Sequence, residues 1–275
     1  MDVQTCLDIA MDHRIQLLCT PHALPRKPIF NVAYATRIDE ITQFVKKHIR
    51  PNTWSHHEEK VTRELAQPRG SAQIVVLLLQ PASNHPFEQG KLATIASSPS
   101  LSALNRAFTV CSRGSISLSD VTVLDSLPHI RPLDRIDVSL RTTLRKLVLR
   151  AVRDRKPKVV LCAWKDSTDQ ASAIPLGDLM SVGVGKVFTR NTFTDVQGRT
   201  TIRVNAFHPS YAVNYHPTVS ILRQLLLLEI NQTIWHLNGQ WREEAWMTQL
   251  RSACQHYATR YQSKLSCSSG HIMLR

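Results

Sequence analysis

A run of six consecutive apolar residues at positions 74–79, Ile-Val-Val-Leu-Leu-Leu, constrains the fold more than any other segment. A strand with one face in water alternates apolar and polar residues, whereas a short continuous apolar run is typical of a strand buried on both faces of a parallel sheet. The run ends at Gln80-Pro81, which favours a loop at this point. We therefore predict a central strand that needs helices on both faces of its sheet.

Three further segments, at residues 121–124, 159–164 and 199–207, are rich in branched apolar residues and are predicted strands. Helical spacing of apolar residues marks the intervening and following segments, among them residues 141–153 and 218–230. Alternation of strands and helices implies a parallel sheet covered on both faces. We expect an α/β fold, a three-layer α/β/α sandwich around a central, mostly parallel four-stranded sheet.

The expected core covers residues 71–230, and the chain shows no internal repeat. Residues 1–70 are expected to form a helical N-terminal extension, with helices near residues 36–49 and 58–66. Residues 231–275 are expected to form a C-terminal helix and a tail that pack on the core. With 43% hydrophobic residues, a chain of this length can bury a substantial core.

The formal net charge is +13, which favours an anionic partner, nucleic acid ahead of a membrane surface, over a charge that serves only solubility. The six cysteines are far apart and none belongs to a Cys-x-x-Cys pair, so we expect no zinc ribbon, no iron–sulfur cluster and no cofactor. The sequence contains no apolar run long enough for a membrane span and no secretory signal. We expect an intracellular protein of the nucleus or cytoplasm.

His208-Pro209-Ser210 follows directly on the last predicted strand. In open α/β sheets, ligands bind at the carboxyl ends of the strands, so His208 is placed where it could contact a base or a phosphate. The alternative is that Pro209 and Ser210 only form a turn before the next helix.

The predicted helix at residues 141–153 is basic on the face opposite its apolar stripe. Three more basic residues follow it, at positions 155, 156 and 158. Such a face is usually only solvated, and it could lie far from any ligand; the functional alternative is a contact with phosphates.

Four short motifs at the ends of predicted strands resemble those of the uracil-DNA glycosylase superfamily, over about residues 72–230. His208-Pro209-Ser210 matches the last motif of that superfamily without change, and Pro86-Phe87 resembles its base-stacking segment. Gln80-Pro81-Ala82 stands where the superfamily has a water-positioning loop that carries Asp, Asn or Glu. Asp125 stands in place of an Asn that reads the edge of uracil.

The resemblance implies a DNA glycosylase-like monomer that binds single- or double-stranded DNA and hydrolyses the N-glycosidic bond of a damaged or deaminated base, without a cofactor. It implies that His208 donates to the base oxygen and that Gln80 orients the attacking water. The residues that it places at the base are Phe87, Asp125, Pro81 and Ala82. The residues that it places at the DNA are Pro209, Ser210, Tyr211, Val213 and Arg131.

The departures from the motifs leave two alternatives open. Gln80 is neutral and cannot act as a general base, which favours a catalytically inactive relative that binds nucleic acid or serves as an interaction module. An ionised Asp125 accepts hydrogen bonds but donates none, so a base with an exocyclic amino group would suit an active enzyme better than uracil. An unrelated hydrolase is less favoured, because the sequence lacks both Gly-x-Ser-x-Gly and His-Glu-x-x-His.

Overall fold

The computed structural model describes residues 3–22, 24, 32–67, 73–81, 85–128, 136–166, 174–195 and 197–269. Within these residues the chain forms a five-stranded mixed sheet with the strand order β2-β1-β3-β5-β4. β1 pairs in parallel with β2 and β3, β3 pairs in parallel with β5, and β4 is antiparallel to β5. The strands are β1 (Ile74–Leu78), β2 (Thr122–Asp125), β3 (Val159–Cys162), β4 (Thr192–Thr194) and β5 (Thr200–Asn205).

The α/β class is as predicted, but the sheet has five strands and not four. The additional strand, β4, is only three residues long, so it shows no alternation that could be recognised in the sequence. It forms a hairpin with β5, in which the Asp195 carboxylate accepts the backbone N–H groups of Gln197 and Arg199. Gly198 completes this turn with a φ of 75°, a conformation that favours glycine.

Two hydrophobic clusters lie on opposite faces of the sheet, which accounts for the continuous apolar sequence of β1. Ile74, Val76 and Leu78 belong to one cluster, whereas Val75 and Leu77 belong to the other. All five residues are buried, as expected for a central strand whose alternate side chains point to opposite faces.

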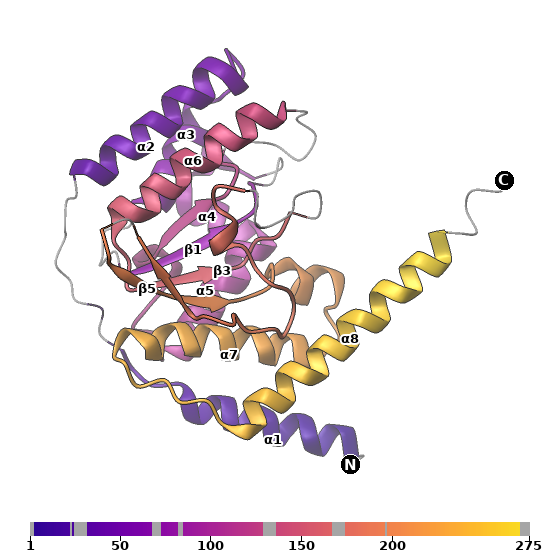
Figure 1. Ribbon diagram of the computed structural model, residues 1–275. Helices are drawn as coiled ribbons and strands as arrows, with labels where there is room; N and C mark the ends of the chain where they lie inside the picture. Colours follow the sequence, from indigo (N-terminus) through magenta and orange to yellow (C-terminus); the bar gives the residue numbers. More distant parts are fainter. Residues whose placement is uncertain are drawn as a thin grey trace.

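Helices cover both faces (Figure 1). On the face of the first cluster lie α5 (Pro99–Cys111), α7 (Ser220–Leu237) and, outside α7, α1 (Val3–Leu18). On the other face lie α2 (Val32–Phe44), which continues as a π-helical turn to Ile49, and α6 (Val138–Arg155), which packs against α2. α3 (His56–Ala66) and α4 (Gly90–Ser97) pack beside β2 and α5, respectively.

A helical N-terminal extension was predicted, but α1 was not located within it. Ile15 of α1 is buried in the first cluster, and polar contacts with α7 add to this packing. Gln224 and Ser220 of α7 donate to the Asp12 and Asp8 carboxylates at 2.8 and 2.9 Å. The indole of Trp235 donates to the backbone oxygen of Leu18 at 2.9 Å. Tertiary hydrogen bonds of this kind stabilise a helix whose own sequence has a weak apolar stripe.

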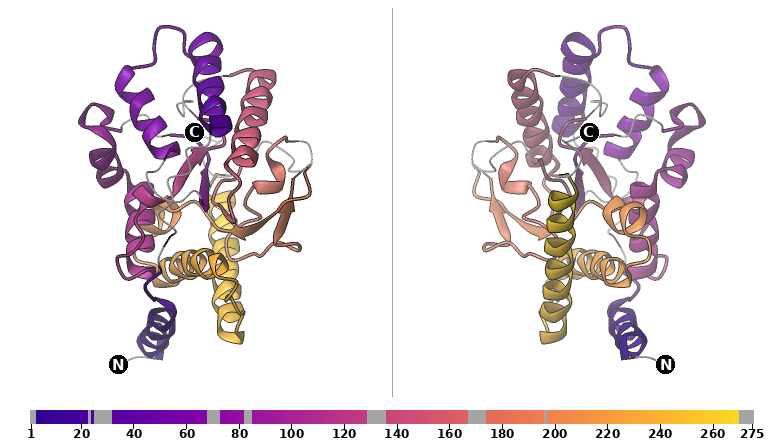
Figure 2. Two further views of the ribbon diagram at one scale, coloured as in Figure 1. Left: turned by 90° about the vertical axis from the view of Figure 1, so that its left-hand side faces the viewer. Right: turned by 90° about the vertical axis from the view of Figure 1, so that its right-hand side faces the viewer.

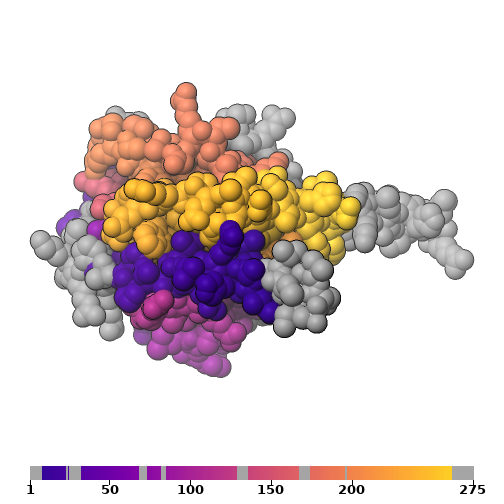
Figure 3. Space-filling view, turned by 90° about the horizontal axis from the view of Figure 1, so that it is seen from below, coloured from indigo at the N-terminus to yellow at the C-terminus, as the bar shows by residue number. Residues whose placement is uncertain are grey.

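The long helix α8 (Ala245–Ser269) lies at the same end of the molecule as α1 (Figure 2). Seen from below, the two helices run side by side across one face (Figure 3), and the Arg14 guanidinium of α1 lies over the Trp246 ring of α8. No helix in the described ranges combines the length and the apolar character needed to cross a lipid bilayer.

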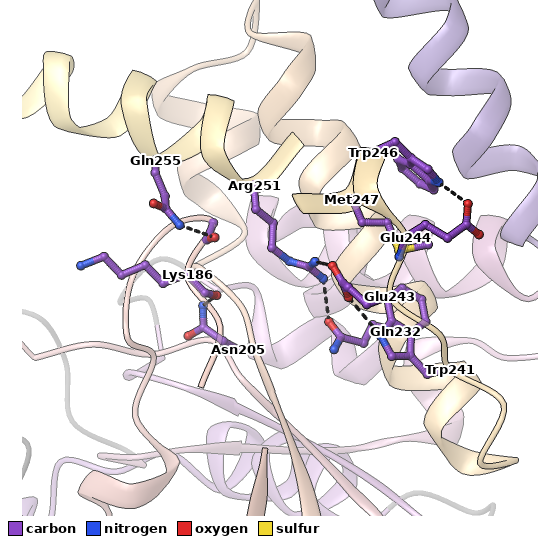
Figure 4. Close-up of polar contacts among 11 residues, drawn as sticks. Lys186, Asn205, Gln232, Trp241, Glu243, Glu244, Trp246, Met247, Arg251 and Gln255 are labelled. Atoms are coloured by element: carbon purple, nitrogen blue, oxygen red, sulfur yellow. Dashed lines mark hydrogen bonds and ion pairs between the residues drawn. The ribbon is translucent and has the colours of Figure 1, made fainter. Parts of the chain in front are cut away.

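Polar contacts hold α8 against the loop that follows β3 and against α7 (Figure 4). Gln255 donates to the backbone oxygen of Gly185 at 2.7 Å, and Arg251 binds Glu243 and the Gln232 side chain. Gly185 has a φ of 68°, and a Cβ atom there would clash with the carbonyl oxygen of Arg251. A glycine is therefore needed at position 185 so that this loop can pack closely on the backbone of α8, which is a structural role.

Candidate functional site

A cavity of about 570 Å³ opens at the carboxyl ends of β1 and β2, beside the loop that follows β5. Its walls come from the segment after β1, the end of β2, α3, the start of α5 and the loop at residues 208–215. A volume of this size is typical of small-molecule sites, and its place is where open α/β sheets bind ligands.

The cavity brings together most of the residues that the sequence singles out. Its lining includes Gln80, Pro81, Phe87, Asp125, His208, Ser210 and Tyr211. Pro209 is buried and Val213 is half-buried, and neither lines the cavity. Ala82 and Arg131 lie outside the described residues. Three separate segments of the chain meet here because parallel strands place their carboxyl ends at one edge of the sheet.

His208 is half-buried at the start of the loop after β5, and its Nδ1 atom lies 2.6 Å from the Ser210 hydroxyl. Burial lowers the pKa of His208, so the ring is neutral at pH 7. When the Ser210 hydroxyl donates to Nδ1, the ring carries its proton on Nε2. We assign this tautomer because it gives both groups a complementary partner and leaves a donor for a ligand.

Asp125 is the last residue of β2 and lies opposite Leu78 of β1 in the parallel register. Its carboxyl group has no hydrogen-bond or ion-pair partner within the part of the chain that the structure describes. Burial raises its pKa to about 7. Near neutral pH the group therefore exists both as an acceptor-only carboxylate and as a neutral acid that can donate one hydrogen bond.

Phe87 forms part of the cavity wall at the start of a short 3₁₀ helix, Phe87–Gln89. The His85 ring contacts it edge-on, with 5.4 Å between the centroids, and also lines the cavity. Burial lowers the pKa of His85, which the Glu58 carboxylate partly offsets. His85 was not predicted as a site residue, although its position between Gln80-Pro81 and Phe87 was a usable signal.

Tyr211 and Tyr215 lie at the two ends of a π-helical turn that follows His208-Pro209-Ser210. Single π-turns often occur at functional sites. Tyr211 is half-buried between the Phe207 and His216 rings, at centroid distances of 6.1 and 4.4 Å. Tyr215 is 70% exposed at the rim of the cavity. The aromatic side chain of this loop that is open to solvent is thus Tyr215, which the sequence analysis did not select.

His216 connects this loop to α8. The Tyr257 hydroxyl lies 2.9 Å from the His216 Nδ1 atom, and the Tyr261 ring packs edge-on at 4.3 Å. Burial lowers the pKa of His216 and favours its neutral form. Since His216 also packs on Tyr211, α8 supports one wall of the cavity from behind.

The basic face of α6 does not reach the cavity. Arg145 is buried, donates to Asp166 at 2.6 Å and lies over the Trp164 ring. Arg155 is buried, donates to the Thr122 hydroxyl at 3.0 Å and lies over the Tyr34 ring. These two arginines stabilise the packing of α6, so the basic residues of this helix do not all serve a ligand.

Among the described residues, no group of three or more His, Cys, Asp or Glu side chains is arranged to hold a metal ion. Comparison with known proteins finds no matching family model and no significantly similar curated protein.

Proposed function

We propose that this protein is a DNA glycosylase-like hydrolase of the uracil-DNA glycosylase fold, which binds DNA and removes a damaged or deaminated base. The observation that carries the proposal is that Gln80, Phe87, Asp125 and His208 all line one cavity at the strand ends. Helices on both faces of the sheet are compatible with the three-layer fold of that superfamily.

The cavity offers what a flipped base requires. A base in a duplex must leave the stack and enter a pocket before its glycosidic bond can be attacked. Phe87 and the edge-packed His85 provide aromatic surface for the ring. Tyr215, exposed at the rim, is placed to occupy the space that the base leaves in the duplex.

In the proposed reaction, the oxygen of a water molecule bonds to the sugar carbon C1′ while the bond from C1′ to the base nitrogen breaks. The bonding electrons leave with the base, and the proton released by the water ends on the base. The His208 N–H donates to the departing base oxygen and stabilises its negative charge. The Gln80 amide orients the water and takes no proton. Asp125 contacts the edge of the base.

The test is an excision assay on oligonucleotides that each carry one lesion: uracil, hypoxanthine or a cytosine-type lesion, in single strands and duplexes. We expect abasic sites from at least one lesion, and their loss in the His208→Ala variant. His256→Ala, which alters an exposed histidine of α8, is the matched control. Absence of cleavage by the wild-type protein on every substrate, or full activity of His208→Ala, would contradict the proposal.

A second candidate is a catalytically inactive protein of this fold that binds nucleic acid. The specific observation in its favour is the neutral Gln80 in the wall of the cavity, where the superfamily motif allows a carboxylate. The same assay separates the two candidates, because an inactive binder retards labelled DNA in a gel without producing abasic sites.

A further inference from the structure

Two adjoining hollows lie at the opposite edge of the sheet from the cavity. They measure about 240 and 190 Å³ and share Arg153 and Asp195 in their linings. The end of α6, the residues before β3 and the β4–β5 hairpin form them. The two hollows therefore lie at the amino ends of β3 and β5, whereas the cavity lies beyond the carboxyl ends of β1 and β2. β5 has six residues, so roughly 20 Å separate the two edges.

We call this region the α6–β5 basic surface and define it by the charged residues that line the two hollows. Six of them are basic and two are acidic: Arg37, Arg150, Arg153, Lys156, Lys158 and Arg199, with Asp154 and Asp195. The two carboxylates do not neutralise the basic excess. Such an excess on a protein of net charge +13 attracts polyanions.

Several of these groups are already engaged within the protein. Arg37 is paired with Glu40 and Asp154 at 2.6 and 2.7 Å. The Lys158 ammonium donates to the Leu237 backbone oxygen at 3.2 Å. The Asp195 carboxylate accepts the two backbone N–H groups of its turn and lies 3.8 Å from the Arg199 guanidinium. These contacts fix the shape of the hollows.

Three cations remain for a ligand. Arg150, Arg153 and Lys156 have no ion-pair partner among the residues that the structure describes. Arg150 and Arg153 are three residues apart, so they lie on one side of the last turns of α6. Lys156 is the C-cap residue that directly follows the helix, and it lines the same hollow as Arg153. Arg150 and Lys156 are exposed, and Arg153 lies over the Phe193 ring with its Nε atom buried and without a partner in the described chain.

Stabilisation of the α6 carboxyl end is the simpler explanation for basic residues there, since cations are favourable near the last carbonyl groups of a helix. It does not explain why the β4–β5 hairpin adds Arg199 to the same hollow. A row of cations along two connected hollows instead suits the regularly spaced phosphates of a nucleic-acid strand.

We propose that the α6–β5 basic surface binds the phosphate backbone of nucleic acid, separately from the cavity and without regard to sequence. The two sites face opposite edges of the sheet, so they contact different segments of a nucleic acid or two different molecules. This inference does not depend on the proposed excision activity.

The decisive experiment compares two variants that each remove two positive charges. Arg150→Gln/Lys156→Gln alters the basic surface, and Arg106→Gln/Arg242→Gln alters two exposed arginines elsewhere. The probes are a labelled 30-nucleotide single strand and its lesion-free duplex, titrated with protein between 50 and 200 mM KCl. Each phosphate contact that is lost reduces the slope of log K against log salt by about 0.7 for a single strand and about 0.9 for a duplex.

We expect the first variant to reduce the slope by about 1.4 for the single strand and about 1.8 for the duplex, while the control retains the wild-type slope. Equal effects of both variants, or none, would overturn the inference. Thermal unfolding verifies that each variant folds, and protection of residues 150–158 from hydrogen exchange by the duplex provides a readout in the wild-type protein. Lack of that protection also counts against the inference. A further contrary result would be that Arg150→Gln/Lys156→Gln loses binding to phosphatidylserine vesicles while its affinity for nucleic acid is unchanged.

Failure of this inference and failure of the proposed function are distinguishable. Binding through the basic surface without any abasic product would leave the inference standing and remove the glycosylase. Base excision by the wild-type protein, together with unchanged nucleic-acid binding in Arg150→Gln/Lys156→Gln, would support the glycosylase and remove the inference about the basic surface.

Discussion

The Nδ1 atom of His208 lies 2.6 Å from the Oγ atom of Ser210, two residues later in the same loop. The contact orients the imidazole at the edge of the cavity and determines which ring nitrogen remains for a ligand. It also gives Ser210 a specific role that is distinct from helix capping, since no capping bond from its side chain is formed to the turn that follows.

Replacing Ser210 by alanine removes the partner of Nδ1 and allows the other tautomer of the neutral ring. If His208 is the donor to the departing base, we expect Ser210→Ala to lower the excision rate by roughly 10-fold, which corresponds to about 1.4 kcal/mol in the activation free energy. Single-turnover kinetics would measure it, with Ser252→Ala on the exposed face of α8 as control. An unchanged rate would argue that the hydroxyl does not position His208.

Asp125 should make the stability of the fold depend on pH. Its pKa rises from 3.8 to about 7 on folding, so the folded state holds a proton that the unfolded state has lost between these values. Stability therefore falls as the pH rises from about 4 to about 7. Asp125→Asn removes this dependence, and we expect the difference in unfolding free energy between wild type and variant to change by about 2 to 3 kcal/mol from pH 5 to pH 8.

Urea unfolding at the two pH values measures this change. Asp178→Asn supplies a control for the loss of one carboxylate, because the Asp178 side chain is exposed. If the unfolding free energies of the wild type and of Asp125→Asn changed equally between pH 5 and pH 8, the Asp125 carboxyl group would be well solvated in the folded protein.

Tyr215 is exposed, so its truncation should leave stability unchanged while affecting duplex DNA. We expect Tyr215→Ala to reduce excision from duplexes by about 10-fold or more and to leave single-stranded substrates almost unaffected, because only a duplex requires the vacated space to be filled. Tyr215→Trp should retain activity. Equal losses on both substrates would assign Tyr215 a contact with the base.

Tyr257 should contribute to stability through its bond with His216. Tyr257→Phe leaves the buried Nδ1 atom of His216 without its hydroxyl partner, and we expect a loss of about 1 kcal/mol in unfolding free energy. Tyr215→Phe removes an exposed hydroxyl from the same loop and should cost much less. Faster hydrogen exchange of residues 211–215 in the Tyr257 variant would show that α8 supports the cavity wall.

Much of the fold could be predicted because it depends on local composition. A continuous apolar run identifies β1 as a strand buried on both faces, and branched residues identify its parallel neighbours. β4 and α1 escaped prediction because their stability comes from elsewhere: β4 from its pairing with β5, and α1 from apolar packing and side-chain hydrogen bonds against α7.

The sequence by itself determined that the segments after β1, β2 and β5 meet, since the ends of parallel strands must share one edge of a sheet. Gln80, Asp125 and His208 therefore could be grouped without coordinates. Only the tertiary structure decided which side chains of the loops face solvent, as Tyr215 does and Tyr211 does not. It also decided that the basic end of α6 lies away from the cavity, because the direction and placement of a helix depend on long-range packing.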